Sequence, residues 1–183
     1  MVTENLLTKT DGKDAARSSH ATPHRVLRLW NRWGKTVLGR RIYSFILGRT
    51  APYSGSIGAQ VIKLQPGFVC VVLNDRRSVR NHLNSVHAIA LANLGELASG
   101  LAMISAVPSS VRAIVVKLDI EYLKKARGRL TAEGRATPPE DITSSITSIA
   151  EAEINDAEGD LVARMKVHWR LSPKETLIRK GDE

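Results

Sequence analysis

Glu96 is the residue whose type and position most clearly indicate chemistry, because it is the only carboxylate in a long apolar segment, residues 81–105. From Val86 onward this segment has apolar residues at three- and four-residue spacings, which predicts a helix. Apolar residues also cover most of its other faces, so we expect the helix to be buried nearly all round. Burial of a carboxyl group favours its neutral form, which raises its pKa and suits it to act as a general base.

His87 stands near the start of the same helix, nine residues before Glu96. Nine residues of a regular helix turn through about 180° and rise about 13 Å, so the two side chains cannot meet within one chain. A two-fold dimer would bring Glu96 of one subunit to His87 and the preceding loop of the other. The spacing favours such a shared site. The alternative is that His87 only begins the helix and that Glu96 is a surface carboxylate.

The segment resembles the hot-dog thioesterases, and within them the branch related to the phenylacetic-acid-pathway thioesterases. Those proteins carry an Asn, a His six residues later and an Asp or Glu nine residues after the His, the spacings of Asn81, His87 and Glu96. The runs TAPYSGSI at residues 50–57 and RNHLNSVHA at residues 80–88 are similar to a subgroup often described only as a domain of unknown function.

Two residues depart from that pattern. Asn84 stands where the family often has Gly, but Asn tolerates a left-handed backbone. Ile89 stands where the family has a small residue, at a point where the backbone would lie close to a ligand. These departures keep a second interpretation open, a hot-dog module that binds an acyl-thioester or a lipid without hydrolysing it.

The resemblance implies an acyl-coenzyme A thioesterase, with its site at a homodimer interface and pairing of two dimers as a further option. Glu96 would be the general base or nucleophile, Asn81 would hold the carbonyl or orient the water, and His87 would shape the loop or assist proton transfer. The N–H groups of Ala88 and Ile89, at the helix start, would bind the developing oxyanion. Four later cations would bind the coenzyme A phosphates, unless they are a solvated strand end: Lys124, Lys125, Arg127 and Arg129.

Residues 24–49 contain seven cations and no acidic residue. Their cations and their apolar residues, Trp30 and Trp33 included, fall on nearly opposite faces of a helix. Gly39 is expected to break this helix, and a second short helix over residues 40–47 would follow. The tryptophans would either pack on the core or enter an anionic membrane surface, and we expect them to pack on the core.

The rest of the chain alternates in the manner of strands. We expect strands in five places and a turn region at residues 133–139; the strands are 57–61, 68–73, 112–122, 144–155 and 161–171. Strands grouped around one apolar helix predict the α+β class, with a curved antiparallel sheet wrapped around one long central helix, the hot-dog arrangement. This domain would span residues 50–173, after a flexible tail (1–23) and the basic helical extension (24–49), with a C-terminal tail at 174–183.

Composition narrows the classes of function. The chain has 183 residues, 43% of them apolar and 25% charged, as in an ordinary soluble protein. A net charge of +9 suits nucleic acid or an anionic membrane, but the strands lack aromatic residues between their cations, which argues against nucleic acid. The single Cys70 excludes an intramolecular disulfide, and the histidines lack metal-ligand spacing, so we expect no metal and no other cofactor. These features, with no signal-peptide pattern, favour the cytoplasm, with the mitochondrion as the alternative.

Overall fold

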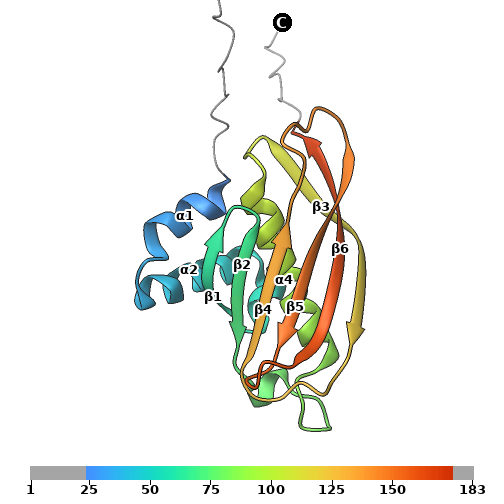
Figure 1. The fold of residues 1–183 in the computed structure, drawn as a ribbon. Helices are drawn as coiled ribbons and strands as arrows, with labels where there is room; N and C mark the ends of the chain where they lie inside the picture. The colour runs from blue at the N-terminus through green and yellow to red at the C-terminus, as the bar shows by residue number, and fades with distance from the viewer. Residues whose placement is uncertain (1–23, 175–183) are drawn as a thin grey trace, which may run out of the picture.

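One six-stranded sheet forms the body of the protein, and the computed structural model describes it within residues 24–174 (Figure 1). The strand order is β1-β2-β4-β5-β6-β3, and every neighbouring pair is antiparallel. The strands are β1 (Gln60–Gln65), β2 (Phe68–Leu73), β3 (Val111–Tyr122), β4 (Leu130–Ala136), β5 (Ile146–Asn155) and β6 (Leu161–Pro173). The tails expected at 1–23 and 174–183 lie outside the described residues, apart from Lys174.

The sheet wraps around a single long helix, α4 (Ala88–Ala106), whose side chains fill the core. By length and hydropathy α4 could cross a membrane, but 67% of its most apolar window is buried in the protein, as expected of a core helix. The expected α+β class and the hot-dog arrangement are therefore confirmed.

The sheet approaches α4 closely at Gly134 in β4. A Cβ atom on Gly134 would lie 2.3 Å from the carbonyl oxygen of Ala98, so only glycine fits at this crossing. The expected turn at 133–139 is wrong in its first part, because residues up to Ala136 continue β4. In the sequence Gly134 favoured a turn. In the structure it is required because α4 packs directly against the strand at this residue.

Three short helices and one 3-10 turn complete the fold: α1 (Arg25–Trp33), α2 (Val37–Thr50), α3 (Pro52–Ser56) and η1 (Arg77–Val79). The break between α1 and α2 falls at residues 34–36 and not at Gly39, in contrast to the prediction. Thr36 caps α2 by accepting a hydrogen bond from the Gly39 N–H at 3.0 Å, so Gly39 lies inside the first turn. A Cβ on Gly39 would lie 1.9 Å from the carbonyl oxygen of Trp33, which explains the glycine.

The tryptophans of the basic segment pack inward, as predicted. Trp30 is only 8% exposed and meets Tyr43 edge-to-face at 5.1 Å between ring centroids. The Tyr43 hydroxyl donates a hydrogen bond to the Val26 carbonyl at 3.2 Å, joining α2 to α1. Trp33 is half-buried against the same core.

Strand β3 forms one edge of the sheet and contains a bulge at Val116. The sequence predicts Ile114 on the same face as Leu118, but the bulge places Ile114 on the opposite face of the strand. Val115 pairs with the buried Trp169 on the face that packs on α4, whereas Ile114 pairs with an exposed arginine on the outer face. The helix-side face of β3 nevertheless remains partly uncovered, since Leu118 is 45% exposed.

Candidate functional site

Asn81 shapes the loop that leads into α4. Its Oδ1 accepts hydrogen bonds from the Leu83 N–H at 2.9 Å, the Ser85 N–H at 3.2 Å and the Ser85 hydroxyl at 3.1 Å. Asn84, between them, has a φ of 53°, so it does adopt the left-handed backbone that glycine would allow. These bonds occupy the Asn81 oxygen within the loop, and the predicted contact of Asn81 with a substrate would fall to its amide nitrogen.

His87 caps the N-terminus of α4. Its exposed ring accepts a hydrogen bond at Nδ1 from the Ile89 N–H at 3.0 Å. The Ile89 N–H is therefore not free, in contrast to the prediction that Ala88 and Ile89 both offer open donors. The Ile89 side chain is 55% exposed and points away from the core.

Glu96 lies in the middle of α4, half-buried against apolar groups. Its Oε1 is 3.8 Å from the point where a Cβ on Gly100 would lie, and the Trp169 ring is 3.2 Å from the same point. Burial raises the pKa of Glu96 above its usual value. Its carboxylate makes no ion pair and accepts no hydrogen bond from any other residue within 24–174. A half-buried carboxyl with a raised pKa is a candidate for a functional group, and the role of Glu96 as a base stays a prediction.

His87 and Glu96 do not meet within the chain, because α4 is an unbroken helix between them. Ile89 and Glu96 are seven residues apart and thus on nearly the same face of the helix. That face looks toward Trp169 in β6, the neighbour of the edge strand β3. Glu96 therefore lies on the side of α4 next to the uncovered edge of the sheet.

A cavity of about 260 Å³ adjoins the start of α4. It is lined by residues of α3, of η1 and of the first two turns of α4, including Tyr53, Ser78, Arg80, His87, Ile89 and Asn93. Asn93 is 7% exposed, and its Nδ2 donates a hydrogen bond to the Tyr53 carbonyl at 3.0 Å. Its Oδ1 is buried without a hydrogen-bond partner among residues 24–174. An unsatisfied buried acceptor costs about 1–3 kcal/mol, so this atom suits a ligand or a water molecule that donates a hydrogen bond.

Asn93 is the one lining residue that stands out in the sequence without being assigned a role there. Its polar side chain on an otherwise apolar helix could have marked it as a candidate site residue. Its position in a cavity could not be read from the sequence, because the other wall comes from Tyr53, forty residues earlier.

Lys124 is held by two carboxylates. Its ammonium group lies 2.7 Å from Asp156 and 2.6 Å from Asp160, and these two hydrogen-bonded carboxylates raise its pKa above the usual range. The charge of Lys124 is therefore already matched, and it does not fit the predicted role of phosphate ligand.

The other three cations of that segment, Lys125, Arg127 and Arg129, are exposed. Their loop is bound to the loop before α4: the Val86 N–H donates to the Ala126 carbonyl at 2.8 Å, and the Gly128 N–H donates to Asp75 at 3.0 Å. Arg80 also pairs with Asp75 at 2.6 Å and holds the pKa of that carboxyl below its usual value. These bonds join the two loops, which carry the cations, and Figure 1 shows both loops at the end of the molecule where α4 begins.

No group of three or more His, Cys, Asp or Glu within residues 24–174 is arranged to hold a metal ion.

One curved antiparallel sheet around one helix defines a hot-dog protein, and solved structures with this fold include proteins named as thioesterases. A protein solved as a genomics target is 29% identical, with a TM-score of 0.71 over 81% of this chain and 99% of its own. A thioesterase family protein from Silicibacter pomeroyi is 18% identical, with a TM-score of 0.62 over 72% of this chain and 96% of its own. A hypothetical thioesterase with coenzyme A from Streptococcus pneumoniae TIGR4 is 20% identical, with a TM-score of 0.58 over 70% of this chain and 99% of its own.

The chain belongs to the family described as a domain of unknown function, DUF4442, whose model matches residues 39–171. The resemblance to this subgroup is thereby confirmed, and the hot-dog fold is shared with proteins named as thioesterases. Among curated proteins no match was found.

Proposed function

We propose that this protein hydrolyses an acyl-thioester of coenzyme A at a site shared between two subunits. The observation that carries the proposal is Glu96, a half-buried carboxyl with a raised pKa and no partner within residues 24–174, beside the open edge of the sheet. Two further facts support it: the fold is that of named thioesterases, and one of these was solved with coenzyme A.

A second copy of the chain would complete the site. The edge strand β3 presents unpaired backbone groups and exposed apolar side chains, and such an edge favours pairing with another strand. Exposed apolar residues on β3, after it and at the start of α4 would be covered in a two-fold pair: Ile89, Leu118, Tyr122 and Leu123 are each 45–55% exposed. Pairing of β3 with β3 would bring Glu96 toward the partner's loop and helix start.

In the proposed reaction Glu96 accepts one proton and later donates it. Its carboxylate takes a proton from a water molecule, and the water oxygen bonds to the thioester carbonyl carbon. The carbon–sulfur bond then breaks, and the proton passes from Glu96 to the sulfur of coenzyme A. Direct attack by the carboxylate itself, followed by hydrolysis of the anhydride, is the alternative route.

The start of α4 would bind the oxygen that becomes negative. Its N–H groups and the positive end of the helix dipole stabilise an anion there. The Ile89 N–H becomes available when the substrate oxygen replaces His87 Nδ1 as its acceptor, so His87 acts as an exchangeable cap in this proposal. Lys125, Arg127 and Arg129 would meet the phosphates of coenzyme A, while Asn81 keeps the loop in shape.

The test is release of free thiol from a panel of acyl-coenzyme A esters of different chain length. Glu96→Gln keeps the shape and removes the ionisable group, so turnover should fall by about two to four orders of magnitude. Glu153→Gln is the matched control, because Glu153 is exposed on β5 and lies outside the site. Wild-type turnover by Glu96→Gln would end the proposal.

The second candidate is a binding module without turnover. It is favoured by the bulky Ile89 at the helix start, 55% exposed, and by the His87 cap on its N–H. Calorimetric titration with coenzyme A separates the candidates: tight binding with no thiol release from any ester would select the binding module.

A further inference from the structure

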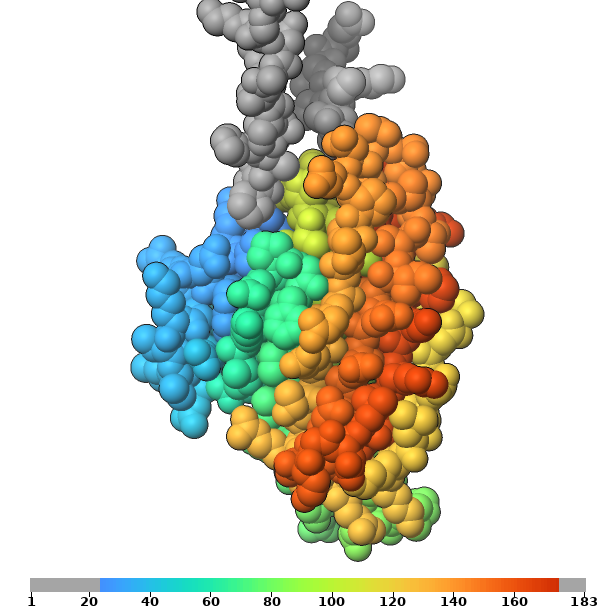
Figure 2. Space-filling model, in the orientation of Figure 1, coloured from blue at the N-terminus to red at the C-terminus, as the bar shows by residue number. Residues whose placement is uncertain are grey.

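Helix α2 carries apolar residues on its outward face, although its inward face packs on the core. Val37, Leu38 and Phe45 are 66%, 67% and 68% exposed. At 100° per residue these three, together with Arg41 and Arg49, fall within about 120° of the helix circumference. We call these five residues the α2 face. Figures 1 and 2 show α2 beside β1, at the opposite edge of the sheet from β3.

The chain segment that carries this face has charges of one sign. Residues 24–74 include eight lysines and arginines and no aspartate or glutamate. Arg41 and Arg49 are both exposed, and neither forms an ion pair with another residue of 24–174. An anionic partner is therefore the electrostatic complement of this part of the surface.

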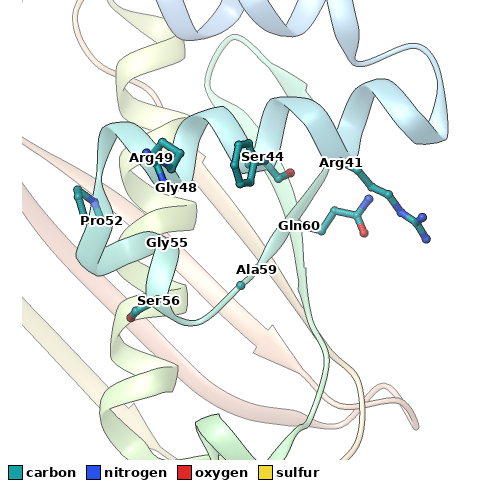
Figure 3. A pocket seen from close by; sticks show the side chains of 11 residues that line it. Arg41, Ser44, Gly48, Arg49, Pro52, Gly55, Ser56, Ala59 and Gln60 are labelled. Atoms are coloured by element: carbon teal, nitrogen blue, oxygen red, sulfur yellow. The ribbon is translucent and has the colours of Figure 1, made fainter.

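A cavity of about 690 Å³ opens at the same place, between α2, α3 and the start of β1. Figure 3 shows Arg41 and Gln60 at one end of it and Arg49 and Pro52 at the other. Gly48 and Gly55 lie between, and a Cβ on Gly55 would lie 2.6 Å from the Gly48 Cα, so the two helices pack with bare backbone there. The cavity thus offers two guanidinium groups at its ends, which suits phosphate groups.

Exposed apolar residues beside the cations distinguish the kind of anionic partner. Single-stranded nucleic acid would be bound by cations together with aromatic side chains that stack on successive bases. The α2 face has one exposed aromatic residue, Phe45, and its other exposed apolar residues cannot stack. A bilayer surface takes both components at once, because apolar side chains enter the interface while arginines meet lipid phosphates. Trp30 is buried and cannot enter a membrane, so a membrane contact of the basic segment would have to use the exposed residues of α2 instead.

We propose that the α2 face docks on an anionic lipid bilayer, with Val37, Leu38 and Phe45 in the interface and lipid phosphates at Arg41 and Arg49. This inference does not depend on the thioesterase proposal, because Glu96 and β3 take no part in it.

The experiment is flotation of the full-length protein with phosphatidylcholine vesicles, with and without phosphatidylglycerol. Wild type should bind only the anionic vesicles. Each arginine near an anionic surface contributes about fivefold to binding, so Arg41→Gln with Arg49→Gln should weaken it by about 25-fold. Phe45→Ser, at unchanged charge, should also weaken it severalfold.

The control for net charge is Arg112→Gln with Arg170→Gln, which removes two exposed cations from β3 and β6. Circular dichroism establishes that each variant is folded. Equal loss of binding in both double variants, or wild-type binding by Phe45→Ser, would overturn the proposal. Tight binding to single-stranded RNA that abolishes vesicle binding and is unaffected by Phe45→Ser would assign the surface to nucleic acid instead.

Discussion

Glu96 shows how one buried charge links stability to chemistry. A raised pKa means that between the usual and the raised value the folded protein binds more protons than the unfolded chain. The contribution of this group to stability is therefore complete below the usual glutamic acid pKa and is lost as the pH rises through the folded-state value. The same penalty on the charged form makes the carboxylate a stronger base.

This gives a prediction for stability. The free energy of unfolding of Glu96→Gln should exceed that of wild type above the folded-state pKa, and the difference should disappear at acid pH, where Glu96 is neutral. Urea denaturation at a series of pH values measures it, with the exposed Glu153→Gln as the control variant. A difference between Glu96→Gln and wild type that is constant with pH would contradict the assigned cause.

At the scale of residues, Glu96 and His87 could be singled out as candidates from the sequence, because an isolated polar residue on an apolar helix is a local signal. It did not reveal the state of Lys124, since the carboxylates that hold it come 32 and 36 residues later. The His87 cap on Ile89 was also missed, although the two are only two residues apart, because a histidine before a helix does not by itself show where its ring points.

At the scale of elements, the loop before α4 is built from local hydrogen bonds, and its left-handed residue is Asn84. Because glycine would adopt this positive φ freely, we infer that the loop needs the backbone shape and not the Asn side chain. The helix itself was expected within two residues of its observed start at Ala88.

A test of the loop follows from its geometry. Asn84→Gly should leave the unfolding midpoint in urea unchanged or raise it, since glycine adopts a positive φ freely. Asn84→Ala should destabilise the protein by about 1 kcal/mol, the usual cost of a left-handed backbone. Equal midpoints for the alanine and glycine variants would show that the left-handed conformation is not maintained.

Elements defined by tertiary packing were less predictable. Gly39 and Gly134 looked like breaks in the sequence but are glycines because a carbonyl oxygen lies against each. The bulge at Val116 likewise left no trace in the alternation of β3. Local propensity cannot distinguish a glycine that ends an element from one that admits a neighbour.

For the molecule as a whole, the proposed dimer would cover the exposed edge strand β3, which alone would be prone to pair with other chains and aggregate. Edge strand β3 is long, and its side chains on the face of α4 include Leu118 and Tyr122, each 45% exposed. The α2 face lies at the other edge of the sheet, so a dimer through β3 leaves it free to meet a membrane.

The dimer can be tested with a matched pair of substitutions. Leu118→Lys places a charge in the proposed interface and should raise the dimer dissociation constant by at least about tenfold. Ile149→Lys adds the same charge at a residue of similar exposure, 47%, on β5 away from the edge, and should leave the dimer intact. Sedimentation velocity distinguishes them. A wild-type protein that is monomeric at micromolar concentration would refute the shared site.

The most direct measurement of the central claim is complementation within a mixed dimer. Glu96→Gln removes the base, and Ile89→Pro removes an N–H at the start of α4 in a turn that tolerates proline. Each variant alone should be inactive toward acyl-coenzyme A. In the co-expressed mixture, half of the dimers would pair one variant with the other, and one of their two sites would be intact, so thiol release should recover to about a quarter of the wild-type rate. A mixture no more active than its two components would contradict a site that joins Glu96 of one subunit to the helix start of the other.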